Sequence, residues 1–237
     1  MSLTQRQSEY LQRMGIDVWV PRMATATGEQ GLATEINVLD TTAGLPAAAD
    51  KPCELDTLCE QVAACTRCSL HETRTQAVFG VGDRQADWMI IGEAPGEDED
   101  RQGEPFVGRA GRLLNAMLLA IGLQREQVFI ANILKCRPPR NRDPKPEEVT
   151  ACEGFLNRQI ELIDPKIILA VGRVAAQNLL KIDTPIGRMR GQQYEYGTSR
   201  RPVFVTYHPA YLLRSPREKR KVWQDLQTAM HIYRKMV

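Results

Sequence analysis

The chain has 237 residues and a formal net charge of +2, and 43% of its residues are hydrophobic. These values are typical of a globular protein, and the near balance of acidic and basic residues gives no global argument for nucleic-acid binding. No run of about 18 apolar residues occurs, so the sequence predicts no membrane span. The N-terminus lacks the basic and apolar pattern of a secretory signal, which favours a cytoplasmic protein.

The first part of the chain differs in composition from the rest. The segment 8–14 has a helical pattern, whereas residues 24–51 are rich in Ala, Thr, Gly and Asp. Such a composition buries little apolar surface and is typical of a mobile linker. We therefore expect a poorly ordered N-terminal extension over residues 1–54 and one compact domain over residues 55–237. Two roles for the extension are open: recruitment of a protein partner, or packing against the domain.

Apolar runs in the compact region predict buried strands, and amphipathic segments lie between them. Strands that alternate with helices are typical of a parallel sheet covered on both faces, so the sequence predicts an α/β fold. We expect strands at 88–91, 128–133, 167–171 and 203–206, and helices at 111–121, 146–163, 173–180 and from 216 to near the C-terminus.

The segment 92–108 lies between the first of these strands and the first of these helices. It combines glycines, prolines and acidic residues with a single aromatic residue, Phe106. Open α/β sheets bind ligands at the carboxyl ends of their strands, which is where this segment lies. A loop of this composition is costly to order, so we expect it to serve catalysis or recognition.

Four of the six cysteines have a spacing compatible with a metal site. Cys65 and Cys68 form a C-x-x-C pair, Cys136 follows a predicted strand, and Cys152 lies early in a predicted helix. Four thiolates bind either a tetrahedral zinc ion or a [4Fe–4S] cluster. The spacing does not choose between these two, nor does it exclude unrelated buried thiols.

Polar and aromatic residues near the ends of several predicted strands are expected to converge at one edge of the sheet. They include Glu93, Phe106, Asn132 and His208. An amide reads the hydrogen-bonding edge of a base, and an aromatic ring stacks on it. A histidine stabilises developing negative charge, and a carboxylate positions water or balances a developing cation. Together these groups suit a planar heterocycle that leaves as an anion.

Each of these residues also has a purely structural explanation. Asn132 has the character of a turn cap, Phe106 that of a core residue, and Glu93 that of a cap for backbone N–H groups. The pair His208-Pro209 has the character of a loop anchor. Convergence on one edge weakens that explanation.

Basic residues gather in segments 137–145, 188–201 and 214–221, and each cluster is either a solvated face or a phosphate-binding surface.

Four motifs in chain order resemble those of the family 4, iron–sulfur uracil-DNA glycosylases. The resemblance covers residues from about 55 to 235, and the motifs are specific in combination. The motifs are Gly92-Glu-Ala-Pro-Gly96, Gly103-Glu-Pro-Phe-Val-Gly108, Asn132 with Lys135-Cys-Arg-Pro-Pro139, and His208-Pro-Ala-Tyr-Leu-Leu-Arg214.

The resemblance implies a three-layer α/β/α fold with a four-stranded parallel sheet. It also implies a [4Fe–4S] cluster held by Cys65, Cys68, Cys136 and Cys152. The implied reaction is hydrolysis of the N-glycosidic bond of a deoxyuridine that has been flipped out of DNA, the first step of base-excision repair. The implied partner is uracil-containing DNA, and a monomer is expected.

The resemblance also assigns roles to individual residues. It places the uracil on Phe106, with Asn132 reading its N3–H and O4 edge and His208 stabilising negative charge at O2. Either Glu93 or Glu99 orients water or supports the cationic sugar, and this choice is open. The backbone at Gly92 and Ala94 lines the base pocket. DNA contacts are expected from Arg140, Arg142, Leu212 and Arg214. Leu212 and Arg214 belong to the loop that the resemblance implies to enter the duplex and fill the space left by the flipped base.

Some relatives in this superfamily bind uracil-DNA covalently through a histidine in the loop after the Asn132 motif. Segment 133–150 contains no histidine here, so hydrolysis with turnover is expected. Two other classes of function are open from the sequence: a non-catalytic nucleic-acid-binding or adaptor protein with the same fold and cluster, and a zinc-containing hydrolase.

Overall fold

The computed structural model describes residues 51–237, with side chains from residue 54 onward. The expected helix over 8–14 and almost all of the expected extension lie outside the described residues. The described part begins with helix α2 (Lys51–Ala63). None of the described helices is long and apolar enough to cross a membrane.

The centre of the described part is a six-stranded mixed sheet in the order β1-β3-β2-β4-β6-β5. The four predicted strands form its parallel centre and match the predicted ranges closely. They are β2 (Trp88–Gly92), β3 (Val128–Asn132), β4 (Ile167–Val171) and β6 (Arg201–Thr206).

The prediction of a purely parallel, four-stranded sheet is wrong, because an antiparallel strand is added at each edge. Strand β1 (Val81–Gly82) pairs with β3, and β5 (Gln193–Tyr196) pairs with β6. Strand β1 has only two residues, so it leaves no periodic signal in the sequence. Strand β5 alternates exposed and half-buried residues and lacks the continuous apolar run of the central strands.

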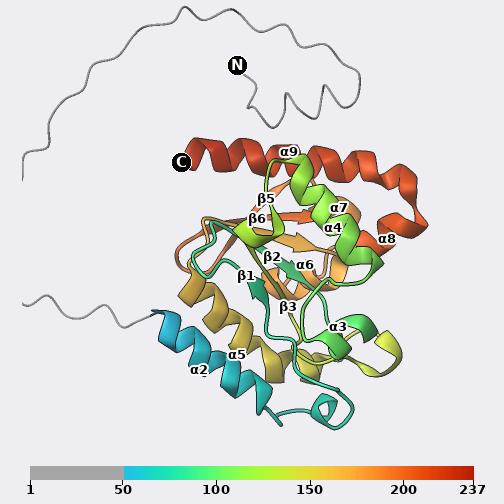
Figure 1. Cartoon of the computed structure of the whole chain (residues 1–237). Helices are drawn as coiled ribbons and strands as arrows, with labels where there is room; N and C mark the ends of the chain where they lie inside the picture. The colour runs from blue at the N-terminus through green and yellow to red at the C-terminus, as the bar shows by residue number, and fades with distance from the viewer. Residues whose placement is uncertain (1–50) are drawn as a thin grey trace, which may run out of the picture. The chain divides into compact units, whose positions relative to one another are not determined.

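Helices cover both faces of this sheet (Figure 1). One core lies beneath α2, α5, α6 and α7, and the other lies beneath α4, α8 and α9. The helices are α3 (Glu97–Gln102), α4 (Arg109–Ala120), α5 (Pro146–Ile163), α6 (Arg173–Leu180), α7 (Ile186–Met189), α8 (Pro209–Arg214) and α9 (Lys219–Met236), with short 3-10 turns at Ser69–Glu72, Arg125–Gln127, Pro139–Asn141 and Pro216–Glu218.

The alternation of side chains along each central strand explains why both faces need a helical layer. In β2, Met89 and Ile91 enter one core, and Trp88 and Ile90 enter the other. All five residues of β2, β3 and β4 are buried. A parallel sheet covered on both faces requires such uninterrupted apolar strands.

The strand order places a topological switch point between β2 and β4. The chain leaves β2 toward α4 on one face of the sheet and leaves β4 toward α6 on the other. The two connections therefore diverge, and a crevice opens outside the carboxyl ends of these strands. Such crevices are where open α/β sheets bind ligands.

Candidate active site

A cavity of about 440 Å³ opens at this edge of the sheet. Segments widely separated in the chain contribute to its wall, which brings together most of the residues predicted from the sequence. Gly92 lies directly behind this wall. The predicted residues that line the cavity are Glu93, Ala94, Glu99, Phe106, Asn132, Arg142, His208 and Arg214.

The inner end of the cavity is built from Gly92, Asn132 and Phe106. Asn132 ends strand β3 and is only 2% exposed, and its Oδ1 atom has no hydrogen-bond partner among the described residues. A Cβ atom at Gly92 would lie 2.4 Å from that Oδ1 and 2.7 Å from the Phe106 ring. Only glycine at position 92 lets these two side chains approach the strand end. A buried acceptor without a partner is costly, so it indicates a missing donor.

Phe106 is buried and has a left-handed backbone, with φ of 55°. Its ring stacks on the imidazole of His208, with centroids 5.5 Å apart. The strained backbone is held from outside, because the guanidinium of Arg125 donates to the carbonyl oxygens of Pro105 and Phe106 at 2.6 and 3.3 Å. Backbone strain of this kind persists where the surrounding structure fixes it, and it is common at binding sites.

His208 caps the N-terminus of α8, and its tautomer follows from that role. Its Nδ1 accepts a hydrogen bond from the backbone N–H of Ala210 at 3.1 Å. Burial, with a smaller contribution from the charge of Arg214, lowers the pKa of His208 to about 4. The imidazole is therefore neutral at physiological pH, and its proton is on Nε2. A neutral Nε2–H is a donor for an oxygen that gains negative charge.

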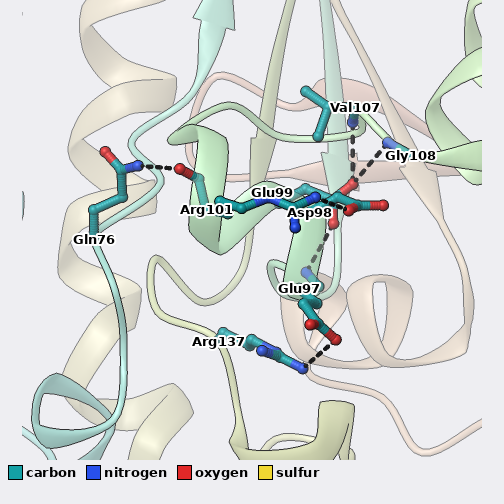
Figure 2. Close-up of polar contacts among 9 residues, drawn as sticks. Gln76, Glu97, Asp98, Glu99, Arg101, Val107, Gly108 and Arg137 are labelled. Carbon is teal, nitrogen blue, oxygen red and sulfur yellow. Dashed lines mark hydrogen bonds and ion pairs between the residues drawn. The ribbon is translucent and has the colours of Figure 1, made fainter.

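Glu99 organises the backbone of segment 92–108. Its carboxylate accepts hydrogen bonds from the N–H groups of Gly96, Val107 and Gly108 at 3.1, 3.0 and 3.3 Å. Figure 2 shows this carboxylate joining the start of α3 to the residues that follow Phe106. With three donors already bound, Glu99 has little free acceptor capacity for water or a sugar cation.

Salt bridges and hydrogen bonds outside the cavity hold helix α3 in place. Arg137 reaches Glu97 at 3.3 Å, and the side-chain amide of Gln76 donates to the carbonyl oxygen of Arg101 at 2.8 Å (Figure 2). The four acidic residues of the first turn of α3 also interact favourably with the helix dipole. The acidic composition that marked this segment in the sequence thus has a local structural cause.

Glu93 differs from Glu99 in that no described residue hydrogen-bonds to its carboxylate. Burial is the main reason that its pKa rises to about 7. The negative charge of Asp143 raises this pKa further, and the positive charge of Arg173 lowers it. A carboxyl group with a pKa near neutrality inside a cavity has the properties of a general base.

Of the predicted DNA-contacting residues, Leu212 is wrongly assigned. Its side chain is fully buried in the core beneath α4 and α9, because α8 turns that face toward the sheet. The neighbouring Tyr211 is exposed and lines the cavity. Its ring lies 5.0 Å from that of Tyr207, which is itself covered by the guanidinium of Arg190.

The three predicted arginines have different environments. Arg214 is exposed at the cavity wall. Arg142 also lines the cavity, but its guanidinium binds both carboxylate oxygens of the buried Glu148, at 2.9 and 2.5 Å. Arg140 is exposed, outside the cavity, on a residue with φ of 58°.

The four predicted metal ligands line one small cavity beneath α2 and α5. N–H groups point at three of the sulfurs: the Arg74 guanidinium lies 3.0 Å from Cys136, and backbone N–H groups lie 3.4 Å from Cys152 and 3.5 Å from Cys65. Burial raises the pKa of the Cys152 thiol to about 11. Within the described residues, no three His, Cys, Asp or Glu side chains are already arranged as a metal site.

Comparison with known proteins agrees with this geometry. The family model described as the uracil DNA glycosylase superfamily matches residues 79–227. A type-4 uracil-DNA glycosylase of Archaeoglobus fulgidus is 47% identical, with 73% of this chain and 90% of that protein covered. The type-4 enzyme of Sulfurisphaera tokodaii is 44% identical, with 73% of this chain and 82% of that protein covered. The type-4 enzyme of Thermotoga maritima is 42% identical, with 76% of this chain and 95% of that protein covered.

The chain belongs to the uracil DNA glycosylase superfamily. Within it, the similarity places the chain in the type-4 family, as its motifs indicated.

Three residues of this family member take part in the site but were not predicted from the sequence. They are Tyr211 at the cavity wall, Arg125 behind Phe106, and the buried Lys135. The exposed position of Tyr211 follows from the direction of α8, and the contact of Arg125 follows from the path of a loop. Lys135 carried a possible signal, because it lies within the Lys135-Cys-Arg-Pro-Pro139 motif.

Glu93 gives this type-4 family member an expected pH dependence. If its ionised form is active, kcat/KM should fall about tenfold per pH unit below pH 7 and reach a plateau above it, because the pKa of Glu93 is about 7. Glu93→Gln should lower the plateau by about 10²-fold and remove the acid limb. Excision rates measured from pH 5 to 9 test this, with Glu161→Gln as control, because Glu161 is exposed on α5 and lies outside the cavity. An unchanged acid limb in Glu93→Gln would assign the titration to another group.

Proposed function

We infer that this protein is a uracil-DNA glycosylase that hydrolyses the N-glycosidic bond of deoxyuridine in DNA and so initiates base-excision repair. The observation that carries this inference is the buried Oδ1 of Asn132, which has no partner within residues 51–237 and lies beside the Phe106 ring at the inner end of the cavity. The reaction class agrees with the names of its relatives, which are type-4 uracil-DNA glycosylases.

Asn132 selects the base. Uracil presents a donor at N3–H next to an acceptor at O4, and an amide side chain offers the complementary acceptor and donor. Cytosine presents the opposite order on the same edge. Since Asn132 is 2% exposed, a mismatched base would leave buried polar groups unpaired, and this penalty is on the order of several kcal/mol. The Phe106 ring supplies a stacking surface for the base.

His208 stabilises the leaving group. Cleavage of the bond between N1 and C1′ leaves its electron pair on uracil, and the negative charge spreads to O2. The neutral Nε2–H of His208 is a preorganised donor for this oxygen, because Nδ1 is already occupied by the Ala210 N–H. The departing anion is later protonated by solvent.

Glu93 acts on the sugar side of the reaction. As the base leaves, C1′ becomes cationic, and a nearby carboxylate lowers the energy of that state. Water then adds to C1′ and loses a proton to the Glu93 carboxylate. The near-neutral pKa of Glu93 suits both roles, whereas Glu99 is engaged by three backbone donors. This difference favours Glu93 over Glu99 as the catalytic carboxylate.

Cys65, Cys68, Cys136 and Cys152 would hold a [4Fe–4S] cluster. The N–H groups at three of their sulfurs, one of them from the cationic Arg74, stabilise thiolates, which are the form that ligates metal. When bound, the cluster would tie α2, α5 and the residues after β3 together. Purified protein is expected to be brown and to contain about four iron atoms per chain. A colourless, zinc-containing active protein would contradict this assignment.

Tyr211 is proposed to enter the space left by the flipped base. It replaces Leu212 in this role, because Tyr211 is exposed at the cavity wall and Leu212 is buried. Stacking of an aromatic ring on a base contributes about 1–3 kcal/mol. We therefore expect Tyr211→Ala to slow excision from double-stranded DNA about 10- to 100-fold, with a much smaller effect on single strands.

Excision rates on matched single- and double-stranded oligonucleotides test this prediction. Trp223→Ala is the control, since Trp223 is similarly exposed on α9 but lies outside the cavity. Equal losses on both substrates in Tyr211→Ala would show that the residue does not act on the duplex.

The activity itself is tested with oligonucleotides that contain one deoxyuridine. Incubation with the brown protein, followed by alkali, should cleave the strand at that position, and the matched thymidine oligonucleotide should stay intact. Salt-dependent binding without release of uracil would instead indicate a non-catalytic DNA-binding protein.

A further inference from the structure

Lys135 is a fully buried lysine that lies between the cysteine cavity and the base pocket. Its side chain is 1% exposed, and its ammonium donates to the backbone oxygen of Asn132 at 2.9 Å and to Oε1 of Gln159 at 2.6 Å. Gln159 is also fully buried, and its amide group donates to the Phe79 carbonyl oxygen at 2.9 Å. A lysine is almost never buried in this way unless a specific partner requires it.

The ammonium replaces a missing strand at the edge of the sheet. The pairing of β1 with β3 covers only Ile130 and Phe129 and does not extend to Asn132. On the other side, β2 stays paired beyond the strand, because the N–H of Ile133 donates to Gly92 at 2.9 Å. The Asn132 carbonyl would otherwise be a buried acceptor without a partner. Lys135 therefore holds the peptide that carries the base-reading amide.

Lys135 also reaches the cysteine cavity. It lines that cavity together with Cys65, Cys68, Cys136 and Cys152, and its backbone N–H donates to the Cys152 sulfur at 3.4 Å. One residue therefore contacts both the base-reading end of β3 and the cysteine cavity.

We propose that Lys135 is a positioning residue for uracil recognition. Its ammonium, held by the buried Gln159 amide, fixes the Asn132 peptide where the side-chain amide meets the uracil edge. This inference rests on the proposed glycosylase function and adds a named connection between the cysteine cavity and base selection.

The test is Lys135→Met, which keeps an unbranched side chain one atom shorter and removes its charge and donors. With the iron content equal to that of the wild type, the affinity for free uracil, measured as product inhibition, should fall about tenfold, the loss expected for one charge-assisted hydrogen bond. Affinity for DNA with an abasic-site analogue should stay within about twofold, because those contacts lie elsewhere. The reduction potential of the cluster should become more negative, since a nearby cation favours the more reduced, more negative state.

Lys181→Met is the matched control, because Lys181 is exposed and pairs with Glu153 at the surface. An iron-loaded Lys135→Met protein with unchanged uracil affinity would overturn the proposal, and so would an unchanged reduction potential. If Lys135→Met does not load iron, Gln159→Met removes one acceptor and keeps the ammonium. It should weaken uracil binding about threefold, and an unchanged affinity would refute the proposal. A wild-type protein that releases no uracil would instead refute the function on which the proposal depends.

Discussion

Asn132→Leu is expected to lower kcat/KM for uracil excision by about 10³- to 10⁴-fold. Leucine has the same branched arrangement of side-chain heavy atoms, so the fold and the Phe106 surface should be retained while both hydrogen bonds to the base are lost. Sites built to hydrogen-bond a substrate lose this much when the complementary group is absent, because the polar edge of the base is then buried without a partner. The side chain of Asn132 is 2% exposed, so water cannot compensate.

The measurement is single-turnover excision from a single-stranded oligonucleotide, so that base flipping does not limit the rate. The control is Asn157→Leu, since Asn157 lies on the surface of α5 and pairs with Tyr196 far from the cavity. A loss below about tenfold in Asn132→Leu would show that another group reads the base. The lack of a partner for Oδ1 in the described part of the chain would then need a different explanation.

Much of this site could be predicted from the sequence because of the geometry of a parallel sheet. Gly92, Asn132 and the residues after Thr206 each come directly after an apolar run, and parallel strands bring such positions to one edge. The order of the strands is a different matter, because β4 lies beside β2 and not beside β3. No residue pattern encoded that order, although it creates the crevice.

The two carboxylates show what sequence alone leaves unresolved. Glu93 and Glu99 lie six positions apart in the same acidic segment, and both line the cavity. Their difference is the number of backbone donors each receives, which depends on the return of the chain toward Val107 and Gly108. The path of the chain back toward Glu99 is a tertiary feature. The short helix α3 that precedes it has no apolar periodicity from which the sequence could predict this path.

Leu212 was misassigned for a related reason. In the run Ala210-Tyr-Leu-Leu-Arg214 the apolar character of Leu212 suggested a wedge into DNA, but apolar side chains on a short helix serve the core equally well. Helix α8 packs against α4, so Leu212 points inward and Tyr211 points outward. Only the packing direction separates these two neighbours.

His208→Gln is expected to lower the rate of the chemical step about 10²- to 10³-fold, the usual effect of removing one preorganised donor at a developing anion. The loss should be nearly the same at every pH from 5 to 9, because the pKa of His208 is about 4 and the imidazole stays neutral over this range. The acid limb near pH 7 should persist in this variant, since it belongs to Glu93.

Single-turnover rates across that pH range, on saturating single-stranded substrate, separate the two residues. His231→Gln is the control, because His231 is exposed on α9. If the imidazole instead acted as a charged group, the pH profile of the wild type would show a fall in rate on the alkaline side. That fall would be absent from the profile of His208→Gln. That outcome would contradict the neutral tautomer inferred from the hydrogen bond between Ala210 N–H and Nδ1. A neutral donor suits this site because an imidazolium would repel the positive charge that forms on the sugar. The neutral Nε2–H stabilises the negative charge on the departing base without that repulsion.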